Sequence, residues 1–261
     1  MSQSKLSLAR RNKLRIGILG AGNIGTTLAH RLAAAGHQVK VANSRGPETV
    51  PANALSSGAT AVTASEVVDG VEVLITSVPF ARIPDLRPLI EQLPDDAVVI
   101  DTSNYYPHRD GNIAAVDEGQ VQSLWVSEQF GRKVNKAWNA INTGSFDSKA
   151  TPAGHPDRLA IPVAGDSDAE RALTMSLVEE TGFDALDAGQ LEQSWRQQPG
   201  TPVYCTDFTK EKVAEALAAA DKSRSTLRRD LMIQVNREIL NDPTPVRGED
   251  YMVQLHRVFN T

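Results

Sequence analysis

The sequence predicts an α/β protein built on a doubly wound, mostly parallel sheet, with a small C-terminal region and a long helical C-terminal tail. Two observations carry this prediction. Short apolar runs alternate with segments of helical spacing through the first hundred residues, as in βαβ units. Residues 209–240 then repeat apolar positions at three- and four-residue steps, which is typical of an amphipathic helix.

The first half of the chain is expected to alternate strand and helix. The apolar runs predict strands at residues 14–20, 39–43, 59–62, 71–78 and 97–101. The segments between them predict helices at residues 22–35, 47–57, 65–69 and 83–93. Because right-handed crossovers bring the carboxyl ends of parallel strands to one edge, we expect ligands to bind at that edge.

The second half is expected to extend the same sheet to eight strands and then to end in helices. Strands are predicted at residues 134–141, 159–164 and 183–187, and helices at 121–131, 169–181 and 191–196. One long helix is predicted at 209–240, stopped at 242–245, with a short docking segment at 251–259. The expected division is therefore an arm at 1–13, a nucleotide-binding domain with an appended region at 14–204, and a helical extension at 205–261.

Composition excludes several classes of protein. The 261 residues are 41% hydrophobic and 23% charged, with a net charge of -5, so the basic footprint of a nucleic-acid-binding protein is missing. The single Cys205 allows no intramolecular disulfide framework. No apolar run approaches the ~20 residues that span a bilayer, and the start has no signal-peptide core, so we expect a cytoplasmic location and no membrane partner.

A glycine-rich turn between the first strand and the first helix predicts a dinucleotide site. The pattern G-x-G-x-x-G is weak alone, but here it follows a predicted strand and opens a predicted helix. The first glycine allows a tight turn, the second lets backbone approach a pyrophosphate, and the third lets the helix pack against the sheet. The predicted cofactor-binding residues are Gly20, Ala21, Gly22, Asn23, Ile24 and Gly25. This is the arrangement of a Rossmann-type fold.

The residues after the second strand predict which dinucleotide binds. A site that prefers NAD places an acidic residue there for the ribose 2′-hydroxyl, whereas this chain has Asn43, Ser44 and Arg45. Arg45 can pair with a 2′-phosphate and Ser44 can donate a hydrogen bond to it. The sequence therefore predicts that the site prefers NADP(H). The alternative is that Arg45 is only a solvated residue of a loop.

Two further strand ends are expected to face the nicotinamide half of the cofactor. Ser77, Val78 and Pro79 end the fourth strand and Asn104 follows the fifth. Asp101 either faces the same crevice or only caps its loop.

The loop at 105–111 offers two phenols, His108 and Arg109. They could donate a proton or hold an anionic group, or they could form a surface turn. No catalytic residue is assigned, and no metal site is predicted.

The later motifs leave further alternatives open. Asn139 and Asn142 could bond a ligand or satisfy loop backbone. Trp195 could stack on a flat ring or pack in the core, and Cys205 is interpreted as an incidental buried thiol.

Several motifs together resemble the coenzyme F420-dependent NADP oxidoreductase family. Besides the glycine turn with Asn43-Ser44-Arg45, they are SVP at 77–79, KAWNAI at 136–141, VAGD at 163–166, GFDALDAG at 182–189 and SWRQQPGTPVY at 194–204. The resemblance covers residues 14–204. It implies that NADPH and F420 meet in a cleft, with Ala137 and its neighbours in 136–139 near the stacked rings. The anionic F420 tail would need cations, for which Arg109, Lys133 and Arg196 are candidates.

The resulting hypothesis is an NADP(H)-dependent oxidoreductase that passes hydride directly to a flat second cofactor, F420 by resemblance, or to a small acceptor. One alternative is a reductase of a small carbonyl, imine or quinone. Another is a non-catalytic NADP(H) sensor. The apolar stripe of the tail must be buried, either by a second copy in a homodimer or by the chain's own cleft.

Overall fold

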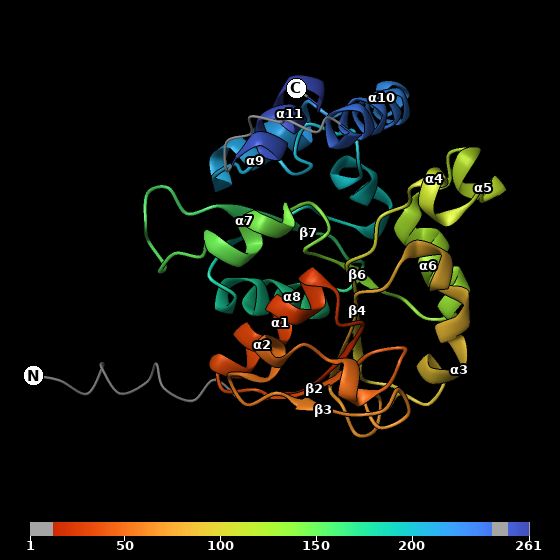
Figure 1. The fold of residues 1–261 in the computed structure, drawn as a ribbon, viewed down its shortest axis with the longest axis vertical. Helices are drawn as coiled ribbons and strands as arrows, with labels where there is room; N and C mark the ends of the chain where they lie inside the picture. Colours follow the sequence, from red (N-terminus) through yellow and green to blue (C-terminus); the bar gives the residue numbers. More distant parts are fainter. Residues whose placement is uncertain (1–12, 242–249, 261) are drawn as a thin grey trace, which may run out of the picture.

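A six-stranded parallel sheet forms the centre of the molecule (Figure 1). We describe a computed structural model of the chain over residues 13–241 and 250–260. The strand order is β3-β2-β1-β4-β5-β6. The strands are β1 Arg15–Leu19, β2 Gln38–Ala42, β3 Thr60–Ala61, β4 Val73–Thr76, β5 Val98–Asp101 and β6 Asn135–Lys136. The predicted doubly wound α/β fold is therefore confirmed.

Helices cover both faces of this sheet (Figure 1). Strand residues alternate between two apolar cores because successive side chains point to opposite faces: Val73 and Ile75 belong to one core and Leu74 to the other. The first core lies under α1 Asn23–Ala34, α2 Ala52–Leu55 and α8 Asp168–Glu180. The second lies under α3 Arg87–Ile90 and α6 Gln122–Phe130.

The expected single sheet of eight strands is wrong. β7 Ala160–Val163 and β8 Asp184–Asp187 pair with each other in a separate two-stranded sheet. An antiparallel bridge between Lys136 and Ala164 joins this sheet to β6. The strand expected at 134–141 is only two residues long, because Trp138 takes a φ of 56° and turns the chain away from the extended path.

Three helices expected in the first half are shorter than predicted. The segment 47–57 divides into the 3₁₀ helix η1 Pro47–Thr49 and α2, because Pro51 lacks the N–H that a continuous helix needs. Residues 65–69 form turns. The segment 83–93 follows η2 Phe80–Arg82 and begins with η3 Pro84–Leu86, and only four of its residues are α-helical, in α3. The other short helices are α4 Pro107–Asp110, α5 Ala114–Asp117, α7 Thr143–Ser148 and η4 Leu191–Gln197.

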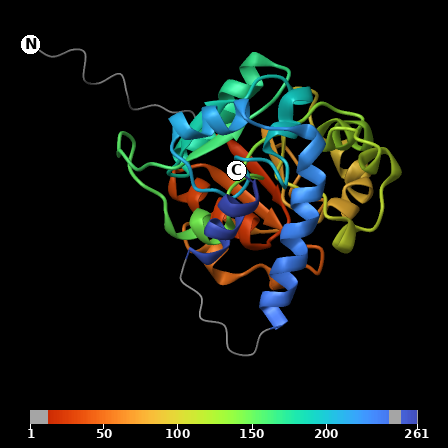
Figure 2. The same cartoon turned by 90° about the horizontal axis from the view of Figure 1, so that it is seen from above.

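The C-terminal tail folds back over one end of the sheet (Figures 1 and 2). The single helix expected at 209–240 is two helices, α9 Lys210–Ala218 and α10 Lys222–Asn241. They are separated because Asp221 accepts hydrogen bonds from the Ser223 backbone and hydroxyl and so starts a new helix. The predicted stop at 242–245 lies outside the described residues. The segment expected to dock forms α11 Tyr251–Asn260.

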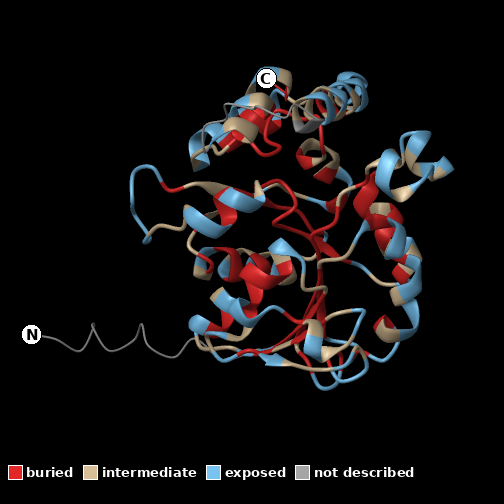
Figure 3. Cartoon of the chain, viewed as in Figure 1, coloured by how far each residue is buried: buried red, intermediate tan, exposed pale blue. Residues whose placement is uncertain are grey.

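A third apolar cluster fixes the tail to the domain. It joins Ala140 to Val203, Tyr204 and Cys205 and to Val213 of α9. On α11, His256 and Asn260 are buried, and the Asn260 side chain donates a hydrogen bond of 3.1 Å to the Tyr204 carbonyl. Figure 3 shows buried segments running from the sheet up to these helices. Among the helices in the described ranges, none is long and apolar enough to cross a membrane.

Candidate cofactor and substrate cleft

Two adjoining pockets open at the carboxyl ends of β1, β4 and β5. The first has a volume of about 620 Å³ and lies beside the glycine turn and the end of β2. The second has a volume of about 390 Å³ and lies between the ends of β4 and β5 and the C-terminal region. Both are lined by Gly22, Ser77, Val78 and Pro79. The two pockets therefore form one continuous cleft.

The three glycines of the turn occupy different surroundings. Gly20 has a φ of +103°, and a Cβ there would lie 2.1 Å from the Ser77 carbonyl oxygen. A Cβ on Gly25 would lie 2.0 Å from the Gly20 carbonyl oxygen, so this glycine packs and does not line either pocket. Around Gly22, nothing lies within 4 Å of a Cβ position. The backbone at Gly22 thus borders open space at the N-terminus of α1, where a phosphate would find free N–H groups.

The loop after β2 forms one wall of the first pocket. Asn43 shapes this loop, because its side chain donates to the Thr49 hydroxyl at 2.8 Å and accepts from the Ser44 N–H at 2.9 Å. Asn43 and Ser44 line the pocket, whereas Arg45 lies next to it with an exposed side chain. The carboxylate lining this pocket is Asp85, which pairs with Arg82 at 3.0 Å.

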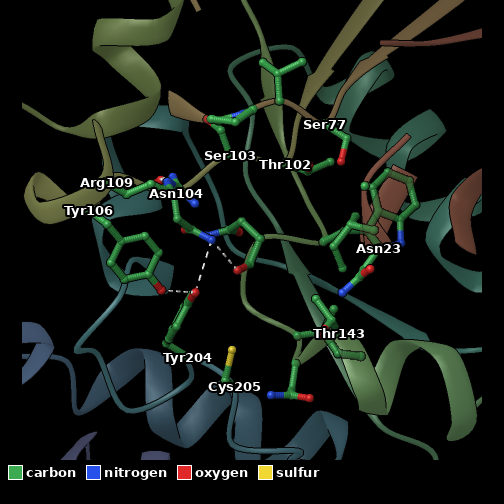
Figure 4. A pocket seen from close by; sticks show the side chains of 18 of the residues that line it. Asn23, Ser77, Thr102, Ser103, Asn104, Tyr106, Arg109, Thr143, Tyr204 and Cys205 are labelled. Atoms are coloured by element: carbon green, nitrogen blue, oxygen red, sulfur yellow. Dashed lines mark hydrogen bonds between the residues drawn. The ribbon is translucent and has the colours of Figure 1, made fainter. Parts of the chain in front are cut away.

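A hydrogen-bonded group of three side chains faces the second pocket (Figure 4). The hydroxyl oxygens of Tyr106 and Tyr204 are 2.5 Å apart, although the residues are 98 positions apart in the chain. The Asn104 side-chain nitrogen donates to the Asn139 carbonyl oxygen at 2.8 Å and to the Tyr204 hydroxyl at 3.3 Å. Because the Asn139 carbonyl can only accept, it fixes the orientation of the Asn104 amide.

Two buried amides hold this group in place. The Asn139 side chain donates to the Asn104 side-chain oxygen at 3.0 Å and to the Gln197 carbonyl at 2.8 Å. The Gln197 side chain in turn donates to the Asn139 side-chain oxygen at 2.8 Å. Asn142 caps α7 by accepting from the Gly144 N–H. The side chains of Asn139 and Asn142 therefore both form hydrogen bonds with other protein groups. This agrees with the interpretation that they satisfy the protein's own polar groups.

Asp101 lies below the pocket and is more than a loop cap. It pairs with Lys136 at 2.5 Å, and both side chains are fully buried. Its carboxylate also accepts from the Ser103 N–H at 3.1 Å and hydroxyl at 3.0 Å, and Lys136 donates to the Ser103 carbonyl. The pair thus ties β5 to β6 and holds the strand end that carries Asn104.

Burial sets the protonation of the titratable groups in the second pocket. It raises the pKa values of both Tyr106 and Tyr204, so both phenols are protonated at neutral pH. It also raises the pKa of the Cys205 thiol, which keeps the thiol un-ionised and unreactive. Burial lowers the pKa of His256 to about 4, so the imidazole that packs edge-on to the Tyr204 ring is neutral.

The cations proposed for an anionic tail are not gathered at the cleft. Arg109 lines the second pocket, but its guanidinium bonds to both carboxylate oxygens of Asp110 and to the Asn104 carbonyl. Lys133 lies 4.0 Å from Asp166, and Arg196 stacks on Trp195, both away from the pocket lining. Trp195 also lies outside this lining.

The predicted cofactor-binding residues lie almost entirely along the cleft. Those that line it are Gly20, Ala21, Gly22, Asn23, Ile24, Asn43, Ser44, Ser77, Val78, Pro79 and Asn104. Ala137 does not: it is fully buried in the core. Thr102 and Ser103, beside Asn104 at a strand end expected to face the cleft, and Trp138, in the 136–139 stretch expected near the stacked rings, also line the second pocket. The sequence reasoning missed Ile141, Thr143 and His256 as lining residues and assigned no role to Tyr204. Within the described part of the chain, no group of three or more possible metal ligands occurs.

Comparison with known proteins finds a family resemblance over the first part of the chain. A family model described as NADP oxidoreductase, coenzyme F420-dependent, matches residues 15–105. This stretch holds β1–β5 and every residue that lines the first pocket. Residues 15–105 are therefore similar to the coenzyme F420-dependent NADP oxidoreductase family. The resemblance predicted from the motifs is confirmed over this stretch.

Three individual proteins are similar to this chain over part of its length. The YjhV protein of Escherichia coli (strain K12) is 43% identical over 82 residues, which are 31% of this chain and 60% of that protein. A hypothetical protein of Sinorhizobium meliloti is 28% identical, with a TM-score of 0.64 over 76% of this chain and 96% of its own. An Arthrobacter sp. FB24 structure, named as an F420-dependent NADP reductase, is 21% identical, with a TM-score of 0.56 over 69% of this chain and 87% of its own. At 21% identity, the similarity to the Arthrobacter structure shows a shared fold only.

Proposed function

We propose that the protein is an NADP(H)-dependent oxidoreductase that transfers hydride between a nicotinamide and an acceptor in the second pocket. The observation that carries this proposal is the junction of the two pockets at Gly22, Ser77, Val78 and Pro79. A dinucleotide that lies along the first pocket can reach the second through this junction. When bound, the nicotinamide supplies the hydride.

The residues of the first pocket fit a dinucleotide. Gly22 leaves open space that a phosphate can occupy and that a side chain at this position would fill. The N–H groups at the start of α1 point to the same space. Ser77 and Val78 then lie where the reactive ring would pass into the second pocket. The match of residues 15–105 to the family model supports this placement.

The loop after β2 supports a preference for NADP(H). Ser44 lines the pocket, and Arg45 follows it with an exposed side chain that can reach a 2′-phosphate. The Asp85 carboxylate in the same pocket is paired with Arg82, which reduces its repulsion of a phosphate.

F420 is the first acceptor to test, because the family is described as F420-dependent. If the acceptor is a flat ring that takes hydride directly, the protein has only to orient the two rings and exclude water. The Tyr106–Tyr204 pair favours a second candidate, a small carbonyl compound, since a phenol can donate a proton.

The test mixes the purified protein with NADPH and oxidised F420 and follows the deazaflavin absorbance. Binding of NADPH is measured in the same sample by its fluorescence, and NADH serves as the comparison cofactor. Bleaching with NADPH supports the full proposal. NADPH binding without bleaching removes F420 and leaves another acceptor. Binding with no turnover of any acceptor would instead support a non-catalytic NADP(H) sensor, and absence of binding would overturn the proposal.

A further inference from the structure

We infer that the second pocket takes a compact, uncharged carbonyl compound, and that Tyr204 donates a proton to its oxygen. This inference rests on the proposed function and names the class of acceptor for the same site. It is argued from the hydrogen bonds around Tyr204, the charges that line the pocket and the segments that enclose it.

The hydrogen bonds leave the Tyr204 proton available for a ligand. The Asn104 amide nitrogen points at the Tyr204 oxygen from 3.3 Å, in an orientation fixed by the Asn139 carbonyl. The Tyr106 hydroxyl, 2.5 Å away, can donate to the same oxygen. With both lone pairs of the Tyr204 oxygen occupied, its own hydrogen is left for the Cys205 sulfur, a weak acceptor that also contacts the hydroxyl, or for a stronger acceptor in the pocket such as a carbonyl oxygen. Figure 4 shows the two phenols and Asn104 meeting at this point.

The same contacts stabilise the charge that develops when the proton leaves. A phenolate on Tyr204 would receive hydrogen bonds from Tyr106 and Asn104, both already in position. Tyr204 touches the reacting oxygen and is the catalytic residue in this assignment. Tyr106 acts through Tyr204 and is a positioning residue.

The charge of the pocket argues against an anionic acceptor. Arg109 is the guanidinium among the described lining residues, and it is already bonded to Asp110 and to the Asn104 carbonyl. His256 is neutral because burial lowers its pKa to about 4. An acceptor with an anionic tail would therefore meet no cation that is free of a carboxylate partner in this lining.

The size of the pocket and its cover argue for a compact acceptor. Its volume of about 390 Å³ is that of a small-ligand site. Tyr204, Cys205 and His256 enclose it from the C-terminal side, and Asn260 holds Tyr204 through the hydrogen bond to its carbonyl.

The reaction balances without a further reactant. Hydride from NADPH forms a C–H bond at the carbonyl carbon, the C=O π electrons move to oxygen, and that oxygen takes the Tyr204 proton to give an alcohol and NADP⁺. Tyr204 then regains a proton from Tyr106, whose hydroxyl lies 2.5 Å away, and water that enters the pocket reprotonates Tyr106.

The experiment observes the hydrogen bond itself, without turnover. Acetophenone labelled with ¹³C at the carbonyl is added to protein loaded with NADP⁺, and the carbonyl stretch is recorded by difference infrared spectroscopy. We expect a downward shift in the wild type that disappears in Tyr204→Phe. The matched control is Tyr105→Phe: this neighbouring tyrosine bonds to Gly111 and Asp117 outside the pocket, so its loss should leave the shift unchanged. No shift in the wild type, or the same shift in Tyr204→Phe, overturns the inference.

A kinetic measurement separates this inference from the proposed function. With NADPH and acetophenone, we expect Tyr204→Phe to lower kcat by about 10²-fold or more, and Tyr106→Phe to lower kcat less, with KM unchanged. NADPH affinity should be the same in all variants. If NADPH reduces F420 but not acetophenone, the oxidoreductase proposal stands and the carbonyl inference fails. If NADPH does not bind, the oxidoreductase proposal itself fails. A thermal unfolding midpoint for each variant confirms that it is folded.

Discussion

At the scale of single residues, we expect Gly22 to matter for cofactor binding and Gly20 to matter for the stability of the fold. A Cβ on Gly22 would enter open space, and its φ of -74° is allowed to any residue. Gly22→Ala should therefore fold normally but weaken NADPH binding about tenfold or more, because the methyl group occupies the phosphate position. Fluorescence titration and thermal unfolding check both parts.

Gly20→Ala is the contrasting variant. Its Cβ would lie 2.1 Å from the Ser77 carbonyl at a φ of +103°. We expect a clear loss of stability by about 1 kcal/mol or more, in addition to any loss of binding. Equal stability of the two variants would contradict the assigned roles.

Arg45 is the residue on which the proposed preference for NADP(H) depends. Arg45→Ala should raise the Kd for NADPH about 10- to 100-fold and leave the Kd for NADH within about twofold, because only NADPH carries the 2′-phosphate. Arg87→Ala is the control, since this arginine pairs with Glu91 on α3 outside both pockets. A parallel loss for NADPH and NADH would remove Arg45 from the site.

At the scale of elements, the Asp101–Lys136 pair links β5 to β6. Asp101→Asn leaves the Lys136 ammonium buried without its counter-ion, so the free energy of unfolding should fall by about 3–5 kcal/mol. Denaturant unfolding measures this change. The double variant Asp101→Asn/Lys136→Met removes the unpaired charge and should recover part of the loss. No recovery would show that the amide alone disturbs the strand end.

The docking of α11 should depend on pH through His256. The pKa of His256 is about 4 in the folded protein against 6.5 for an unperturbed histidine. Between these values the unfolded chain binds a proton that the folded protein does not, so stability falls as pH falls from 6.5 to 4. The loss reaches on the order of 3 kcal/mol at pH 4. Unfolding midpoints across this range measure it, and His256→Gln should flatten the dependence.

The sequence predicts elements best where local pattern decides them. The strands β1, β2, β4 and β5 and helix α1 follow from apolar periodicity and glycine positions, and the structure confirms them within two residues or so at each end. The two-residue length of β6 does not follow, because the turn at Trp138 depends on tertiary packing around a positive φ. The break at Asp221 could have been predicted from an aspartate two residues before a serine at a helix start.

At the scale of the whole molecule, the first pocket was predictable and most of the second was not. The first is formed within the continuous stretch from Leu19 to Leu89, so motif spacing locates it. The second needs Tyr204 and His256 to return to the loop at Asn104. Such long-range contacts leave no periodic signal, and only the side chains at the strand ends were found in advance.

The homodimer expected from the sequence stays a prediction. The structure buries part of the apolar stripe of α10, including Met232, but leaves Leu227 63% and Leu231 41% exposed one turn apart. If a second copy covers them, light scattering should give twice the chain mass for the wild type and the chain mass for Leu227→Lys. A wild-type monomer would contradict the expectation and leave the tail covering only its own cleft.

The two pockets are completed at different times during translation, because one is formed by a short continuous stretch and the other needs residues far apart in the chain. All residues that line the first pocket are present once Leu89 has left the ribosome, whereas the second pocket lacks Tyr204, Cys205 and His256 until the chain has been made through α11. A nascent chain therefore holds every residue of its nucleotide pocket well before it can enclose an acceptor. Until α11 docks, a reduced nicotinamide bound there would face water, which makes the docking of α11 the step that closes the acceptor pocket.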